Sequence, residues 1–158
     1  MLDLTHFHPM VVHFPIALIL VGFLAEVVGI IAKKDFFNKM AFYLLALGSL
    51  AIIVTYISGE AAGGGIEESG TLKDAIEKHQ DAARIAMILT LVTFIFRSIL
   101  LYTKKYSGYL KIIAAVIFLI STLAIARAAS FGGDLVYKHG AGVEVSTEIS
   151  KPNITPEK

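Results

Sequence analysis

Four long apolar stretches divide the chain, and shorter polar segments separate them. The stretches are residues 10–32, 40–57, 82–102 and 110–129. Each can cross a bilayer as a helix, since about 20 apolar residues span the hydrocarbon core. The pattern predicts an all-α fold, a bundle of four transmembrane helices. We expect one membrane domain over residues 1–145 and a polar tail over residues 146–158.

The connections differ in length and character. Residues 33–39 and 104–108 read as tight polar turns, whereas residues 58–81 form a longer polar segment containing three consecutive glycines. Within that segment, Thr71 opens a stretch that resembles a capping box, so a helix is expected to begin there and to run on into the third span. Gly132 and Gly133 are expected to end the fourth span. No internal repeat is evident.

Composition excludes several classes of protein. The mean hydropathy is +0.72, and only 17% of residues are charged, against about a quarter in soluble domains. The absence of cysteine excludes disulfides, thiolate metal sites and covalently attached c-type haem. A net charge of +1 gives no sign of a nucleic-acid partner. No nucleophile with an adjacent base and no phosphate-binding loop occurs.

The distribution of lysine predicts the orientation. Both short turns are basic, whereas the long segment between the second and third spans is net acidic. Basic loops remain in the cytoplasm, so both termini and the long segment are expected on the extracytoplasmic side.

All five histidines fall at the predicted extracytoplasmic face: His6, His8, His13, His79 and His139. His6 is interpreted as an ordinary interfacial residue. His13 lies about one turn inside the first span, where an unpartnered imidazole is costly, so we interpret it as part of a site. His79 can approach it if the first and third spans are neighbours.

Neutral imidazoles on different helices, with no cysteine and few intramembrane carboxylates, suit haem iron. Zinc or copper is the alternative, since both metals accept imidazole. In that case a carboxylate from Glu60, Asp81 or Asp134 would complete the site.

Several charged residues lie within the spans. Arg84 and Arg127 lie just inside the predicted outer helix ends, where they could bind haem propionates or form salt bridges with Asp81 or Asp134. Glu26 is the one carboxylate deep in a span. We expect it to reach the cytoplasmic interface or to pair with Arg97, in preference to a role in proton relay.

Two stretches resemble a known family. They are His8-Pro9-Met10-Val11-Val12-His13-Phe14-Pro15-Ile16-Ala17-Leu18 and Gly132-Gly133-Asp134-Leu135-Val136-Tyr137-Lys138-His139-Gly140-Ala141-Gly142-Val143. The chain is thereby similar, from His8 to Val143, to the bacterial membrane family called domain of unknown function 2231. The resemblance implies a four-helix membrane protein considered a candidate b-type cytochrome, without an established activity. The segment around His79 is more acidic than expected for the family.

These observations together predict a small b-type cytochrome in the bacterial cytoplasmic (inner) membrane, carrying one or two haems b near the outer face. We expect His13 and His79 as one axial pair, and His8 and His139 as a second pair or as support. The protein would transfer electrons within a larger redox complex or to a redox partner protein, with homo-oligomerisation left open. The alternatives are a copper or zinc protein and a structural subunit of a membrane complex.

Overall fold

The computed structural model describes residues 4–63 and 70–143, with side chains from Phe7 onward, and this part of the chain is entirely α-helical apart from turns. Its helices are α1 (Leu4–Val11), α2 (His13–Ile31), α3 (Asp35–Gly63), α4 (Thr71–Tyr102) and α5 (Gly108–His139). Four segments are long and apolar enough to cross a membrane, and the first of them, Phe7–Ile31, includes part of α1. The predicted bundle of four spans is confirmed.

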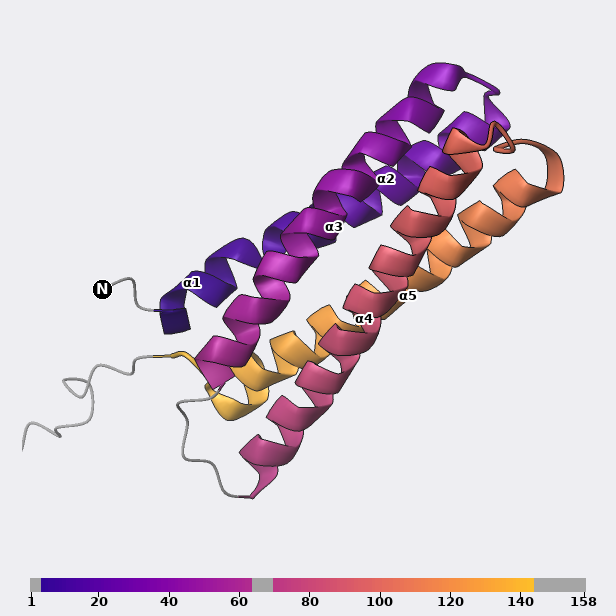
Figure 1. Ribbon diagram of the computed structural model, residues 1–158. Coiled ribbons are helices and arrows are strands. Elements are labelled where there is room, and N and C mark those ends of the chain that lie inside the picture. The colour runs from indigo at the N-terminus through magenta and orange to yellow at the C-terminus, as the bar shows by residue number, and fades with distance from the viewer. Residues whose placement is uncertain (1–3, 64–69, 144–158) are drawn as a thin grey trace, which may run out of the picture.

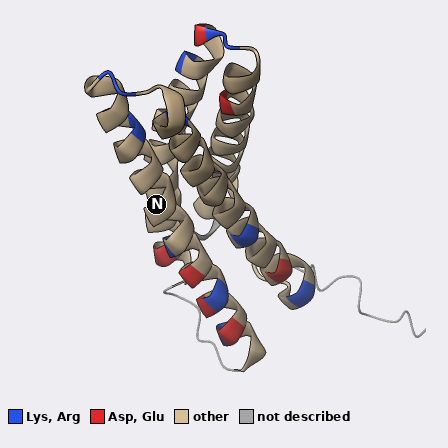
Figure 2. Cartoon of the chain, turned by 90° about the vertical axis from the view of Figure 1, so that its right-hand side faces the viewer, with Lys and Arg blue, Asp and Glu red and all other residues tan. Residues whose placement is uncertain are grey.

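The outside of the bundle is apolar and much of its inside is small or polar. Ile, Leu and Val side chains point outward along α2, α3, α4 and α5, as surfaces in contact with lipid require. Alanine, serine and threonine recur among the buried residues and let the helices approach closely. Charges gather toward the two ends of the bundle (Figure 2).

The helices form two hairpins, α2–α3 and α4–α5, which pack against each other through α3 with α4 and α2 with α5 (Figure 1). We call the end with the turns at residues 32–34 and 103–107 the lysine end. The opposite end, where α3 and α5 finish and α4 begins, is the histidine end. Helix α1 lies there against α3. Pro15 has no N–H to offer the carbonyl of Val11, which explains the interruption between α1 and α2.

Two helices, α3 and α5, are longer at the histidine end than the sequence pattern predicts. Helix α3 continues past Gly59 to Gly63, and α5 continues through Gly132 and Gly133 to His139. The prediction that these glycines end the spans is therefore wrong. Helix α4 begins at Thr71 and runs through His79, as expected, although its N-cap is Gly70 without a side-chain cap.

The two hairpins repeat each other. Each buried residue of α2 matched below has a buried counterpart on α4, at the same interval in residue number as that from His8 to His79. The matched buried residues of α3 and α5 are likewise separated by the interval from Gly59 to Gly132. Matched buried pairs on α2 and α4 are Pro15 and Ala86, Ile19 and Thr90, Gly22 and Thr93, Glu26 and Arg97, and Gly29 and Leu100. Those on α3 and α5 are Ala41 and Ala114, Leu45 and Phe118, Gly48 and Ser121, Ser49 and Thr122, Ile52 and Ile125, and Thr55 and Ala128.

Local details repeat as well. Lys33 and Lys104 occupy matching places in the two turns, and both adopt left-handed backbone angles, φ 52° and φ 56°. Ser49 donates a hydrogen bond to the carbonyl of Leu45 at 2.7 Å, and Thr122 donates to that of Phe118 at 2.9 Å. The expectation that the chain has no internal repeat is therefore wrong.

Repeats that run in the same direction through a membrane are related by an axis along its normal. Residues that match each other close to that axis can meet. The bundle has two such contacts between its halves, one at each end. Glu26 meets Arg97 toward the lysine end, and His8 meets His79 at the histidine end.

Candidate functional site

His8 and His79 face each other between the two halves. Their ring centroids are 6.4 Å apart, and the ring planes are inclined by 74°. His8 lies on α1, and His79 lies in the N-terminal part of α4. Two residues far apart in the sequence thus form one pair. Both rings are only partly exposed.

Each imidazole is held in the same way by the neighbouring helix. Nδ1 of His79 donates to the carbonyl of Ala128 at 3.0 Å, and Nδ1 of His8 donates to that of Thr55 at 3.1 Å. Ser58 Oγ, which donates to the same Thr55 carbonyl at 2.9 Å, lies 3.1 Å from Nδ1 of His8. A carbonyl oxygen can only accept, so Nδ1 carries the proton, and Nε2 of each neutral ring keeps its lone pair.

A glycine makes room for each ring. A Cβ atom on Gly59 would lie 2.9 Å from Cε1 of His8, and one on Gly132 would lie 3.1 Å from Cε1 of His79. Each glycine follows by one helical turn the residue whose carbonyl accepts the hydrogen bond, Thr55 or Ala128. These glycines provide close contact surfaces for imidazole within continuous helices.

The other histidines lie elsewhere. His13 is exposed, and its Nδ1 bonds locally to the carbonyl of Pro9 at 3.1 Å. The expected pairing of His13 with His79 is therefore not formed, and His8 takes that place. Five residues turn a helix by roughly 140°, so the two histidines cannot both face the bundle interior. His139 is the last residue of α5 and is partly buried, whereas the side chain of His6 lies outside the described residues.

The two arginines lie on different helices, Arg84 on α4 and Arg127 on α5. Arg84 is exposed and donates from Nε to the hydroxyl of Tyr56 at 3.4 Å. Tyr56 follows Thr55, whose carbonyl binds His8, so Arg84 lies near the histidine pair along α3. Arg127 lies over the ring of Phe131 at 5.5 Å. Asp134, considered as its partner, instead pairs with Lys138 at 3.0 Å.

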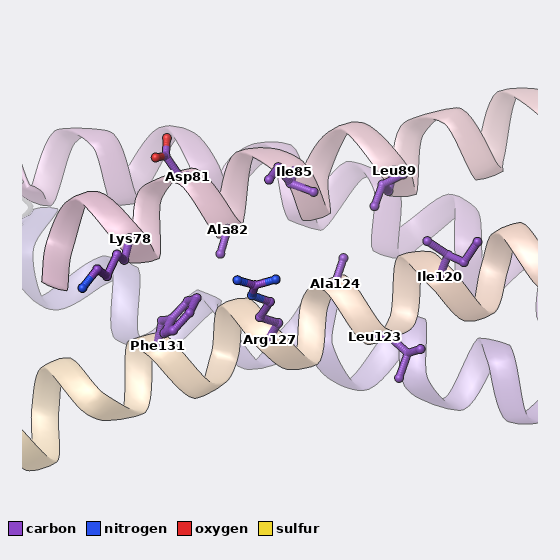
Figure 3. A pocket seen from close by; sticks show the side chains of 10 residues that line it. All are labelled: Lys78, Asp81, Ala82, Ile85, Leu89, Ile120, Leu123, Ala124, Arg127 and Phe131. Atoms are coloured by element: carbon purple, nitrogen blue, oxygen red, sulfur yellow. The ribbon is translucent and has the colours of Figure 1, made fainter. Parts of the chain in front are cut away.

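A groove of about 720 Å³ runs between α4 and α5 (Figure 3). Its inner part is apolar, and Figure 3 shows Arg127 projecting toward α4 between Ala82 and Phe131. Lys78 and Asp81 complete the polar mouth at the histidine end.

A second polar cluster lies toward the lysine end. Arg97 Nη1 forms an ion pair with Glu26 Oε2 at 2.6 Å, and both side chains are at most 2% exposed. Tyr106 donates its hydroxyl to Glu26 and lies 4.9 Å from the Arg97 guanidinium. Burial raises the pKa of Tyr106 above its ordinary value, so it stays protonated as a donor. The expectation that Glu26 pairs with Arg97 is confirmed.

The histidine pair leaves one unprotonated nitrogen, Nε2, on each ring. Within residues 7–63 and 70–143, no group of three or more histidine, cysteine and acidic side chains is placed to hold a metal ion.

Sequence reasoning identified both histidines but missed the residues that hold them: Thr55, Ser58, Gly59, Ala128 and Gly132. A signal was present in the chain. Leu50-Ala51-Ile52 and Leu123-Ala124-Ile125 are identical triplets, and each precedes its glycine by the same interval.

The comparisons with known proteins agree with the architecture. A family model described as predicted membrane protein (DUF2231) matches residues 5–145. No curated protein and no solved structure matches the chain.

Proposed function

We propose, from the premise that the chain belongs to the DUF2231 family of predicted membrane proteins, that it is a b-type cytochrome. His8 and His79 would hold one haem b, which would supply one-electron transfer. The family description states a membrane location and no activity, so the proposal rests on the site.

The observation that carries the proposal is the separation of the two rings. A metal–nitrogen bond of about 2.0 Å and about 1.1 Å from nitrogen to ring centre put two imidazole centroids about 6.2 Å apart when they bind opposite sides of one ion. Two imidazoles at a tetrahedral ion would be about 5.1 Å apart on the same bond lengths. The 6.4 Å between His8 and His79 matches the first arrangement.

The hydrogen bonds support the same reading. A metal-binding histidine normally donates its other ring N–H to a carbonyl or carboxylate, which fixes the ring and raises its basicity. Both His8 and His79 donate from Nδ1 to a backbone carbonyl. Each ring is thus oriented before any ligand binds, and Nε2 is the nitrogen that would contact iron.

The haem supplies the one-electron chemistry, and the protein supplies the ligands, the apolar surroundings and the orientation. The repeat gives the two ligands equivalent settings, so the electron carrier would lie between the halves. Arg84 remains our candidate for pairing with a haem propionate, because its partner Tyr56 adjoins Thr55. One histidine pair supports one haem, and His13 and His139 are not needed as ligands.

The alternative function, a zinc or copper site, is less well supported by the same geometry. A tetrahedral ion needs shorter ring separation and further protein ligands. If the protein were a structural subunit without a cofactor, the two imidazoles that pack against glycines at matching positions would remain unexplained. The separation of the rings therefore favours haem.

The lysines support the expected orientation. The lysine end carries both basic turns, so it is assigned to the cytoplasm and the histidine end to the outer face of a bacterial cytoplasmic membrane. An electron carrier there would exchange electrons with a redox partner protein or a larger complex.

The test is an absorption spectrum of the detergent-purified protein after expression with ample haem. We expect a Soret band, with α and β bands on reduction, at about one haem per chain. His8→Ala and His79→Ala should each abolish six-coordinate haem, whereas the matched variants His13→Ala and His139→Ala should retain it. No chromophore in the wild type, or haem loss only with His13→Ala, would contradict the proposal.

A further inference from the structure

The groove between α4 and α5 has a polar mouth that breaks the internal repeat. Its mouth carries Lys78, Asp81 and Arg127. Under the displacements that relate the two halves, the equivalent residues of the first half are Phe7, Met10 and Val54. Three apolar positions facing the surroundings in one half are thus charged in the other. Of these three residues, Arg127 lies inside a predicted span, where a charge is costly and marks a functional site by default.

The mouth provides hydrogen-bond donors and an acceptor together. Arg127 and Lys78 can only donate, and the Asp81 carboxylate can only accept. Phe131, which lies under the Arg127 guanidinium, adds an aromatic face. This combination can serve a neutral ring with carbonyl or hydroxyl groups, because the cations can donate to a ring oxygen and Asp81 can accept from a hydroxyl.

The rest of the groove is apolar and open to lipid. Ile85, Ile120 and Leu123 are each about half exposed there, at 56%, 48% and 59%. Such a wall would accommodate a hydrocarbon tail lying along the helices, with the polar ring at the mouth.

The mouth also adjoins the histidine pair along both helices. Lys78 directly precedes His79, and Arg127 directly precedes Ala128, whose carbonyl binds His79. Ala82, which lines the groove, belongs to the buried core. The mouth of the groove and His79 therefore lie at the same level of α4 and α5.

We propose that this groove binds the ring of an isoprenoid quinone or quinol, with Arg127 donating to one ring oxygen and Asp81 accepting from the reduced form. Lys78 provides a second donor at the rim. The proposal deepens the proposed electron-transfer function and rests on it for the biological role of the quinone. Binding itself depends only on the groove.

The repeat supplies conservative variants for the test. Arg127→Val and Asp81→Met install the residue types that the first half carries at the same positions, so the bundle should be retained. Lys138→Ala is the control, since it removes a cation from the same end of α5 outside the groove. Binding is measured by titrating a short-chain ubiquinone, its reduced quinol, and separately menadione, into the detergent-solubilised full chain.

We expect saturable binding to the wild type and to Lys138→Ala, with quinone affinity about tenfold or more weaker in Arg127→Val, because a hydrogen bond from a charged donor is lost. Asp81→Met should weaken binding of the reduced quinol more than that of the quinone. Binding that Arg127→Val leaves unchanged would overturn the proposal. Absence of quinone binding, with phosphatidylglycerol co-purifying with the wild type and not with Arg127→Val, would assign the groove to a lipid and overturn it.

A haem spectrum on the same samples separates this proposal from the proposed function. Quinone binding that follows the variants, in protein that takes up no haem, would support the groove and contradict the cytochrome. Haem uptake without quinone binding would do the reverse.

Discussion

Adding one methyl group to the glycines beneath the histidines tests whether those contacts are tight. Gly132→Ala and Gly133→Ala change neighbouring positions of the same helix. A Cβ on Gly132 meets three atoms of the His79 ring, the nearest at 3.1 Å, whereas one on Gly133 meets nothing within 4 Å. Gly59→Ala is the matching change in the first half, where the nearest His8 atom is at 2.9 Å.

The magnitudes follow from two opposing effects. Alanine stabilises a helix by about 1 kcal/mol relative to glycine, and this gain applies to all three sites. Overpacking costs about 1–3 kcal/mol where the neighbour must move. We therefore expect Gly133→Ala to stabilise the protein by about 1 kcal/mol. Gly132→Ala should be about 1–3 kcal/mol less stable than Gly133→Ala, and Gly59→Ala should be the least stable, since its contact is the closest.

The assay is thermal unfolding in detergent, followed by circular dichroism. For a chain of this size, 1 kcal/mol corresponds to a shift in Tm of about 2–4 °C, so the three variants should be resolved. The haem spectrum gives a second reading, because moving an imidazole off its carbonyl partner should perturb the Soret band in Gly132→Ala and Gly59→Ala only. Equal stabilisation by Gly132→Ala and Gly133→Ala, with unchanged spectra, would refute the inference that each histidine ring needs a glycine at its contact with the neighbouring helix.

Three further predictions concern the lysine end and the orientation. Arg97→Met or Glu26→Gln alone should lower the free energy of unfolding by about 3–5 kcal/mol, because each leaves a buried charge uncompensated. The double variant Glu26→Gln/Arg97→Met should recover part of that loss. A double variant no more stable than the single variants would contradict the reasoning. The pKa of Tyr106 is raised in the folded state, so the folded protein keeps a proton that the unfolded chain releases above about pH 10. The free energy of unfolding should therefore fall as the pH rises beyond that value. Tyr106→Phe should flatten this decline. The chain has no cysteine, so Lys105→Cys and Lys138→Cys can each be labelled in whole cells with a membrane-impermeant thiol reagent. Lys138→Cys should react and Lys105→Cys should not. The opposite result would invert the assigned orientation.

The hydropathy pattern alone was sufficient to predict the four spans, the two short basic turns and the start of α4, because a bilayer imposes length and apolarity on each helix independently of its neighbours. The same pattern identified the histidines as a group at one end. It also favoured the Glu26–Arg97 pair, since two opposite charges at similar depth in a membrane have few other partners.

Tertiary structure decided which histidine faces which. The sequence favoured His13 as the partner of His79, whereas His8, on α1 before the break between α1 and α2, is the residue that faces it. It also decided the meaning of Gly59 and Gly132, which look like helix ends in sequence and are imidazole contact sites in space. The repeat was hidden for a related reason. Its matched positions share burial and register, as His8 and His79 do, but many of them differ in identity, as Glu26 and Arg97 do. Packing fixes the place of a residue in the bundle more strictly than its type.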